Sequence, residues 1–210
     1  MKVFIFGNQG NMGKRYTAVL KYLGHEVDGC DLGQSHLDGY KDADAIIVAT
    51  PTHTHLSILN FLLHCRRPVL CEKPIIADKE LAYLEYFLRS ADQYQMQISM
   101  VSQYDYMIPK VMDHTYDNLN TSYDYFRTGN DGLAWDCINV IWHARGKIRL
   151  KNESPLWRCQ INSYPLDQGM VDHSYVEMIE DWLKKPYEPQ YDRILKSHQK
   201  VLDYLNGKFD

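Results

Sequence analysis

The sequence has no excess of charge of one sign and no run of basic residues. Its 23 Lys and Arg side chains stand against 27 Asp and Glu side chains, which gives a formal net charge of −4 at pH 7. A protein that binds nucleic acid or an anionic membrane through its charge needs a basic patch or stripe. We therefore expect neither nucleic acid nor a membrane as a partner.

Long hydrophobic runs, low-complexity tracts and internal repeats are also missing. The apolar stretch after Lys2 is only four residues long, far shorter than a signal sequence core or a membrane-spanning helix. The 210 residues are 45% hydrophobic and 24% charged, which is ordinary for a folded globular chain. We expect a cytoplasmic protein with a substantial buried core.

The sequence contains no Cys-x-x-Cys pair. Its five cysteines are Cys30, Cys65, Cys71, Cys137 and Cys159. An odd number of cysteines scattered through apolar or mixed segments is typical of reduced thiols. We expect neither a disulfide framework nor a zinc site.

The first 95 residues alternate between short apolar runs and amphipathic segments. The apolar runs predict strands over Val3–Phe6, His25–Asp31, Ala45–Ala49 and Pro68–Cys71. Helical spacing predicts helices over Asn11–Leu23, Leu56–His64 and from Asp78 to about Ala91. Strands that are apolar on both faces and alternate with helices indicate a parallel sheet covered by helices. We predict a doubly wound, Rossmann-type α/β domain over residues 1–95.

Residues 96–210 have a different pattern, in which most strands follow one another. The predicted strands are Gln97–Gln103, Ser122–Thr128, Lys147–Lys151 and Trp157–Asn162. The predicted helices are about Leu133–Ala144, Gly169–Leu183 and Tyr191–Leu205. This order indicates a small α+β domain with a mainly antiparallel sheet. Its last helix is a candidate for packing back on the first domain.

A glycine-rich turn separates the first predicted strand from the first predicted helix, with the spacing GxxGxxG. At such a turn, backbone N–H groups and a helix N-terminus can hold a pyrophosphate. The alternative is a plain strand-to-helix turn. The candidate cofactor contacts here are Gly7, Gln9, Gly10, Asn11, Met12 and Gly13.

Asp31 ends the second predicted strand, 18 residues beyond Gly13. A carboxylate at this place would accept hydrogen bonds from the ribose on the adenine side of a dinucleotide. It would repel a 2′-phosphate, and the following Leu32–Ser35 supplies no arginine to compensate. The sequence therefore favours NAD over NADP.

Two more segments follow the third and fourth predicted strands: Ala49–His55 (ATPTHTH) and Cys71–Pro74 (CEKP). Open α/β sheets bind ligands at the carboxyl ends of their strands, where both segments would lie. An ammonium at Lys73 could hydrogen-bond a hydroxyl, polarise a carbonyl or transfer a proton. The alternative is a solvated lysine paired with Glu72. The histidines of the first segment, His53 and His55, have no carboxylate or cysteine at ligand spacing, so we expect no metal site.

In this order, GNQGNMGKR, Asp31, ATPTHTH and CEKP resemble the N-terminal half of the glucose-fructose oxidoreductase/inositol dehydrogenase/MocA (Gfo/Idh/MocA) family. That family includes sugar and inositol dehydrogenases and also biliverdin reductases. The resemblance covers about residues 1–105, and Glu-Lys-Pro is its most specific element. It implies NAD(P) at the glycine turn, a lysine that acts at the substrate, and often a cis peptide before the motif proline. The residues to which it points are Gly7, Gly10, Gly13, Asp31, Thr50, Pro51, His55, Glu72 and Lys73.

Beyond residue 105 the resemblance is weaker, and the second domain is about half the length usual for the family. Relatives carry a helix with an Asp followed four residues later by a His that acts as general acid/base. Asp136 corresponds to the Asp, which implies a role at the substrate or in tuning Lys73, but the position four residues on is Val140. His143 and His173 are the substitutes to consider, although neither has the spacing of the motif.

Together these features predict an NAD(P)-dependent oxidoreductase. It would move a hydride to or from a carbinol or carbonyl carbon of a sugar or polyol-like small molecule, with Lys73 and Asp136 as catalytic residues. Two alternatives are a nucleotide-binding family member without turnover and a reductase of a large conjugated substrate such as a bilin. We also expect a homodimer or larger homo-oligomer, because antiparallel sheets with one exposed face commonly pair.

Overall fold

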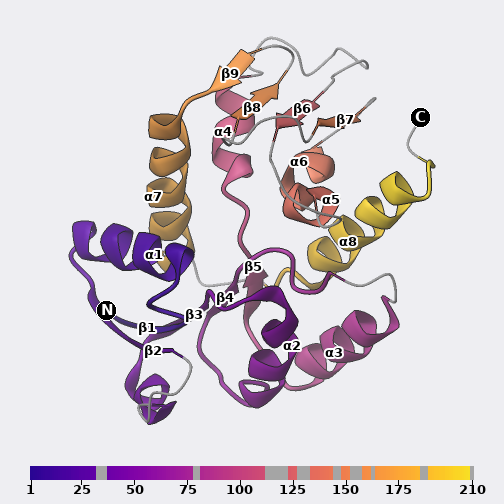
Figure 1. Ribbon diagram of the computed structural model, residues 1–210. Helices are drawn as coiled ribbons and strands as arrows, with labels where there is room; N and C mark the ends of the chain where they lie inside the picture. The colour runs from indigo at the N-terminus through magenta and orange to yellow at the C-terminus, as the bar shows by residue number, and fades with distance from the viewer. Residues whose placement is uncertain are drawn as a thin grey trace. The chain divides into compact units, whose positions relative to one another are not determined.

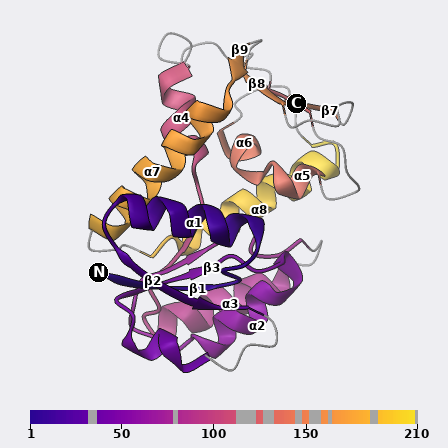
Figure 2. The ribbon, with the colours of Figure 1, turned by 60° about the vertical axis from the view of Figure 1, so that its left-hand side comes forward.

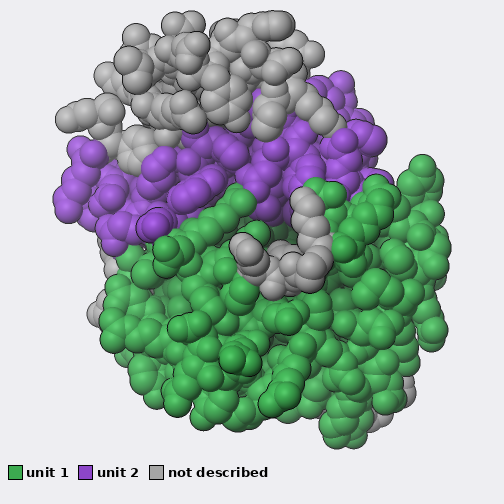
Figure 3. Space-filling view, turned by 180° about the vertical axis from the view of Figure 1, so that it is seen from behind, with its two compact units in different colours: residues 1–101, 179–195 green, residues 102–178, 196–210 purple. Residues whose placement is uncertain are grey.

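The computed structural model describes residues 1–31, 37–77, 81–111, 123–126, 133–143, 148–151, 158–161, 164–184 and 189–208. The chain divides into two compact units, which Figure 3 shows in different colours. Unit 1 comprises residues 1–101 and 179–195, and unit 2 comprises residues 102–178 and 196–210.

Unit 1 contains a five-stranded parallel sheet with the strand order β2-β1-β3-β4-β5. The strands are β1 (Lys2–Phe6), β2 (Glu26–Cys30), β3 (Ala45–Val48), β4 (Val69–Cys71) and β5 (Ile98–Met100). Its helices are α1 (Asn11–Tyr22), α2 (Thr52–Phe61) and α3 (Ala82–Gln93). Helix α1 covers one face of the sheet, and α2 and α3 cover the other (Figures 1 and 2). The predicted doubly wound fold is confirmed.

The central strands explain why this sheet is covered on both faces. Every residue of β3 is apolar and fully buried, and so are Val3, Phe4 and Ile5 of β1. From α1, Tyr16, Val19 and Leu20 are buried on the face that packs on the sheet. Parallel strands buried on both sides have this continuous apolar character, without alternation.

Some elements of unit 1 differ from the predicted ones. Helix α2 begins at Thr52 and not at Leu56, because Pro51 stands at its N-cap and its fixed φ is compatible with a helix start. A short 3₁₀ helix, η1 (Leu37–Asp42), was not predicted.

The predicted strand Gln97–Gln103 was assigned to the wrong sheet. Its structured part is β5, which pairs in parallel with β4 through Val69 and Ile98, so it completes the sheet of unit 1. A three-residue apolar strand contains no local signal for the partner with which it pairs. The order of elements along the chain alone had placed this strand in the second domain.

Later parts of the chain also belong to unit 1: the end of α7 (Gln168–Lys184) and the beginning of α8 (Tyr191–Leu205). The Gln190 N–H donates to the Ile98 carbonyl at 3.1 Å. The Tyr191 hydroxyl lies 2.6 Å from the Met96 carbonyl oxygen, and burial together with nearby Asp92 raises the pKa of Tyr191 to about 12. These contacts fix the start of α8 beside the end of α3.

Unit 2 contains a four-stranded sheet with the order β7-β6-β8-β9. Its strands are β6 (Tyr123–Phe126), β7 (Ile148–Lys151), β8 (Arg158–Ile161) and β9 (Tyr164–Leu166), and its shorter helices are α4 (Tyr104–Val111), α5 (Leu133–Asp136) and α6 (Ile138–His143). Two of the three strand pairs are antiparallel, and β6 with β7 is parallel. The prediction of a mainly antiparallel sheet is confirmed, whereas β9 and α4 were not predicted. The predicted helix Leu133–Ala144 is two short helices separated at Cys137.

Among the described side chains, Cys30, Cys65, Cys71 and Cys137 are free thiols, and burial raises the pKa of Cys71 well above its usual value. In the described parts of the chain, no three His, Cys, Asp or Glu side chains form a group that could hold a metal ion. No described helix has the length and apolar character needed to span a membrane.

Candidate cofactor and substrate site

The predicted site segments of unit 1 lie at one edge of its sheet. Because β1 to β4 are parallel and in register, their carboxyl ends meet at the same edge. The glycine turn follows β1, Asp31 follows β2, Thr50 and Pro51 follow β3, and Lys73 follows β4. The topology thus brings together segments that are far apart in the sequence.

Two of the three turn glycines are required by the packing of the protein itself. Gly7 has φ +84°, and a Cβ on it would lie 2.8 Å from the Ala49 carbonyl oxygen. A Cβ on Gly13 would lie 2.1 Å from the carbonyl oxygen of Gly7. Both positions exclude a side chain through close backbone approach.

Gly10 is different, because an added Cβ would make only ordinary van der Waals contacts there. A Cβ there would meet Gly7 O at 3.4 Å and Ala49 O at 4.0 Å. The first hydrogen bond of α1 runs from Lys14 N–H to Gly10 O at 2.9 Å, so the N–H groups of Asn11, Met12 and Gly13 have no acceptor within the helix. An open cradle at the positive end of a helix fits the pyrophosphate of a dinucleotide.

Asp31 lies directly against this turn. Its carboxylate oxygen Oδ2 accepts a hydrogen bond from the backbone N–H of Gln9 at 3.1 Å. The contact brings the end of β2 to the glycine turn, although the two residues are 22 positions apart. A ribose at this end of the turn would therefore be within reach of a carboxylate.

Glu72 is a buried carboxylate, only 7% exposed, that joins α1 to the segment after β4. Its Oε1 accepts a hydrogen bond from the Tyr16 hydroxyl at 2.5 Å, and its Oε2 accepts one from the backbone N–H of Lys73 at 3.0 Å. An ion pair between Glu72 and the ammonium of Lys73 was the alternative that the sequence left open; the Oε2 contact described here is to the lysine's backbone. Sequence reasoning missed Tyr16, whose only signal was its place on the buried face of α1.

His55 is buried, with 1% of its surface exposed. Its Nε2 lies 2.8 Å from the Thr50 carbonyl oxygen and its Nδ1 lies 2.9 Å from the Pro74 carbonyl oxygen. Burial lowers the pKa of His55, and this outweighs the backbone hydrogen bonding of Thr50, Pro74 and Ile75 and the charge of Glu72, which act in the opposite direction. The ring links the start of α2 to the segment of Lys73.

Lys73 itself is half-buried and stands between the buried Glu72 and Pro74. The Lys73–Pro74 peptide is cis, as the family resemblance implies. A pocket of about 500 Å³ lies next to this segment and the first turn of α2; its lining residues are Thr52, His53, Leu56, Ile76, Ala77 and Tyr83.

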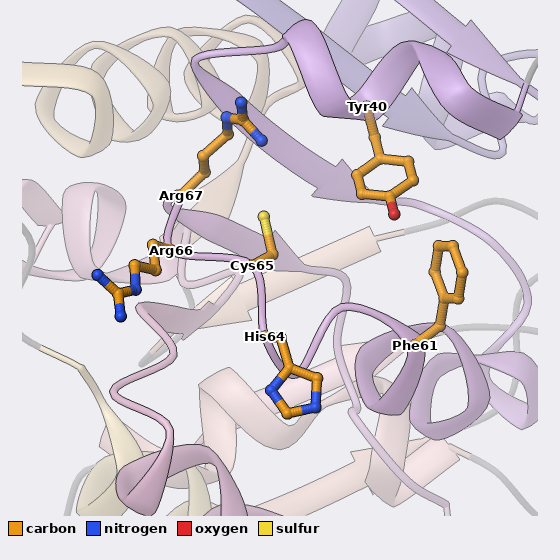
Figure 4. A pocket seen from close by; sticks show the side chains of 6 residues that line it. All are labelled: Tyr40, Phe61, His64, Cys65, Arg66 and Arg67. Carbon is orange, nitrogen blue, oxygen red and sulfur yellow. The ribbon is translucent and has the colours of Figure 1, made fainter.

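A second pocket of about 500 Å³ lies at the other end of α2, before β4. It is lined by Tyr40, Phe61, His64, Cys65, Arg66 and Arg67 (Figure 4). The rings of Tyr40 and Phe61 stand on one side and the two arginine side chains on the other (Figure 4). The Arg67 guanidinium donates to the Lys41 carbonyl oxygen. None of the residues predicted to bind the cofactor lines this pocket.

Asp136 is the one predicted site residue that lies in unit 2, where it ends α5 and is half-buried. Val140, at the position where relatives carry a histidine, is fully buried among core residues. Asn139 is also buried, and its Nδ2 donates to Gln103 Oε1 at 3.3 Å. The motif position is therefore part of the core of unit 2.

The two histidines considered as substitutes have different surroundings. His143 Nε2 lies 2.6 Å from Asp105 Oδ1, and both side chains are partly exposed. His173 is 65% exposed and lies 3.4 Å from Glu177, one turn further along the same helix. His173 is thus a surface histidine of α7, whereas His143 has a carboxylate that orients its ring.

Comparison with known proteins adds to this geometry. The family described as "Oxidoreductase family, NAD-binding Rossmann fold" (GFO_IDH_MocA) matches residues 23–102. Over this range the chain is similar to the Gfo/Idh/MocA family. The matched range begins after the glycine turn and includes Asp31, Thr50–His55 and Glu72–Pro74.

Several inositol 2-dehydrogenases resemble the chain over part of its length. Inositol 2-dehydrogenase 2 of Mycolicibacterium vanbaalenii is 41% identical over 64 residues, which is 30% of this chain and 19% of that protein. Inositol 2-dehydrogenase of Rhodococcus jostii is 34% identical over 117 residues, 54% of this chain and 29% of that protein. The chain therefore matches about a fifth to a third of the length of these relatives.

Solved structures show the same fold at low identity. A Gfo/Idh/MocA family oxidoreductase from Vibrio cholerae superposes with a TM-score of 0.72 at 13% identity, covering 99% of each chain. The WlbA dehydrogenase from Thermus thermophilus, solved with NAD and UDP-GlcNAcA, gives a TM-score of 0.71 at 11% identity, covering 97% of this chain and 94% of that one. These likenesses support the fold.

Proposed function

We propose that this protein is an NAD-dependent oxidoreductase that transfers a hydride to or from a carbinol or carbonyl carbon of a sugar or polyol-like substrate. The observation that carries the proposal is the glycine turn, where open helix N–H groups lie beside the Asp31 carboxylate that accepts from Gln9. The partial likeness to inositol 2-dehydrogenases supports the substrate class.

The chain's own residues would hold the cofactor at the carboxyl edge of the sheet. The N–H groups of Asn11, Met12 and Gly13 would bind the pyrophosphate, and Asp31 would bind the ribose hydroxyls. Bound NAD supplies the hydride acceptor, and NADH the hydride donor. Asp31 would repel the additional phosphate of NADP, which favours NAD.

Lys73 would act on the substrate oxygen. Its ammonium would orient a hydroxyl or polarise a carbonyl, and it would pass the proton that accompanies hydride transfer. Asp136 would bind the substrate or tune Lys73, as the family resemblance implies. Because the motif histidine is Val140 here, the proton would pass through Lys73, a tyrosine or water.

A second candidate function is cofactor binding without turnover. The buried Val140 favours it, since the position of the usual general acid/base belongs to the core. Loss of this histidine would remove one route for the proton while leaving the glycine turn and Asp31 intact.

The test separates cofactor binding from catalysis. NADH is titrated into the protein while the nicotinamide fluorescence is followed, and the protein is then incubated with NAD and a panel of inositols, polyols and sugars while absorbance at the NADH band is recorded. Binding with turnover supports the oxidoreductase, and binding without turnover on the whole panel supports the second candidate. Absence of NADH binding would contradict both.

We also propose that the protein is a homodimer or larger homo-oligomer. The mainly antiparallel sheet of unit 2 supports this, because such sheets commonly pair through an exposed face. Light scattering across the micromolar range should show a mass of at least two chains, and a constant monomer mass would contradict the proposal.

A further inference from the structure

The imidazole of His55 lies between two carbonyl oxygens, those of Thr50 and Pro74. We propose that His55 is a positioning residue that fastens the Lys73–Pro74 segment to the start of α2, and that it bonds both carbonyls at once only when its ring is protonated. The inference rests on the proposed function, because it concerns where Lys73 is held.

The two contacts of the His55 ring differ between its neutral and its protonated state. A carbonyl oxygen only accepts hydrogen bonds, and a neutral imidazole has a single N–H donor. At distances of 2.8 Å and 2.9 Å, a neutral ring therefore bonds one carbonyl and presents a lone pair to the other. A protonated ring has two N–H donors and satisfies both.

The surroundings of His55 set the balance between these states. The ring is almost fully buried, and desolvation of the charged form lowers its pKa below 6.5. Among the described residues, the charged group that acts on it is the Glu72 carboxylate from the segment after β4, which favours the proton. The ring is thus neutral at pH 7 and takes up its proton in more acidic solution.

Lys73 is held on both sides by this arrangement. Its own N–H donates to Glu72 Oε2, and the carbonyl of the next residue contacts His55 Nδ1. Glu72 is in turn held by Tyr16 from α1, while His55 belongs to α2. Removing His55 frees the Pro74 side of the segment and leaves the Lys73 N–H to Glu72 Oε2 contact as the remaining anchor, which should then open more often. Lys73 should lose position without the cofactor turn being disturbed.

The lowered pKa of His55 also determines how the stability of the protein changes with pH. Because the folded-state value is lowered, the unfolded chain takes up the proton first as the pH falls. The contribution of His55 to stability is therefore full above about pH 6.5 and is lost progressively as the pH falls below the unfolded value. His55→Gln, which does not titrate, should remove this part of the acid destabilisation.

The experiment compares His55→Gln, which keeps one donor, with His55→Leu, which keeps none. His64→Gln is the matched control, because it replaces an exposed histidine at the other end of α2. We expect His55→Leu to speed amide hydrogen exchange at Lys73 about tenfold and to lower kcat by roughly 10- to 100-fold, with KM little changed. His55→Gln should keep most of the protection of the Lys73 amide from exchange and most of kcat. His64→Gln should match the unmodified protein in both measurements.

Ring nitrogen NMR of the unmodified protein reads the two states directly and needs no substrate. We expect one protonated ring nitrogen of His55 at pH 7.5 and two at lower pH. The value of kcat should change with pH over the same transition, and this change should be absent in His55→Gln. A ring that keeps a single proton until the protein unfolds at low pH, or Lys73 exchange unchanged in His55→Leu, would overturn the inference. Absence of NADH binding would instead contradict the proposed function and leave these two readouts valid.

Discussion

The carboxyl edge of unit 1 and the motif region of unit 2 differ in what determines the position of their functional residues. In unit 1, each candidate residue follows a parallel strand, so the topology alone brings Gly10, Asp31 and Lys73 to one edge. In unit 2, Asp136 depends on a spacing along a helix, and that helix is interrupted at Cys137. A functional residue anchored to a strand end can be located from the sequence more securely than one anchored to a helix spacing.

The largest difference between the two regions should appear in catalysis. We expect Lys73→Met to lower kcat by roughly 10²- to 10⁴-fold, because it removes the group that polarises the substrate and transfers the proton. Asp136→Asn should cost less, about tenfold, because it keeps the shape and a hydrogen-bonding side chain. Steady-state kinetics measures both, and unchanged NADH affinity and circular dichroism control for folding.

Equal losses in these two variants would show that unit 2 contributes to the chemistry as much as unit 1. A Lys73→Met protein that keeps most of its kcat would contradict the role of Lys73 and direct attention to His143 as the proton donor.

The glycines of unit 1 allow a comparison of stability. Gly13→Ala places a Cβ 2.1 Å from a backbone oxygen and should cost about 3 kcal/mol or more in the free energy of unfolding. Gly24→Ala is the matched control, since φ is +79° there but no atom lies within 4 Å of the added Cβ, and it should cost only about 1–2 kcal/mol. Urea denaturation measures both, and equal losses would show that close packing at Gly13 is unimportant.

Asp31 sharpens the assignment of the cofactor. We expect NADH to bind more tightly than NADPH, and Asp31→Ala to narrow the gap by about 1.5–3 kcal/mol, because hydrogen bonds from the ribose to a carboxylate and the repulsion of the 2′-phosphate are both lost. Fluorescence titration with each nucleotide measures the gap. Equal affinities in the unmodified protein would remove the argument for NAD.

A smaller effect distinguishes two tyrosines of α1. Tyr16→Phe removes a donor from the buried Glu72 carboxylate and should lower the free energy of unfolding by about 1–3 kcal/mol. Tyr22→Phe, at a position that is 79% exposed, should change it by less than about 0.5 kcal/mol. Thermal and urea unfolding of the two variants provide the comparison, and identical stabilities would mean that Tyr16 contributes only packing.

Much of unit 1 could be predicted from the sequence because its signals are local. Apolar runs marked β1 to β4, and the glycine turn and Asp31 followed strands that were correctly placed. The contacts of Tyr16 and His55 could not be predicted in this way, since Tyr16 meets Glu72 across 56 residues and His55 meets Pro74 across 19. Spacing shows that such a residue is on a buried face but does not show which polar group it meets there.

Unit 2 was harder to predict for related reasons. The residues of the strand Ile98–Met100 would suit a strand of either sheet, and only its pairing with β4 assigns it to unit 1. Helix α4 (Tyr104–Val111) was not predicted, and it contains a proline, which is unfavourable in a helix interior, although Met107 and Ile108 are buried there. Tertiary packing overrode the local signal in both cases. The predicted helix start at Asp78 and the residues between α4 and β6 lie outside the described parts of the chain.

The most direct test of the central claim is NADH binding to Gly10→Val. Gly10 has φ −67° and ψ 168°, which valine adopts readily, and an added Cβ would make only ordinary van der Waals contacts, so the variant should fold like the unmodified protein. The branched side chain would occupy the space over the turn in which the pyrophosphate is proposed to bind. The account predicts an unchanged circular dichroism spectrum and unfolding midpoint together with loss of NADH binding in a fluorescence titration. A folded Gly10→Val protein that binds NADH with unchanged affinity would contradict it.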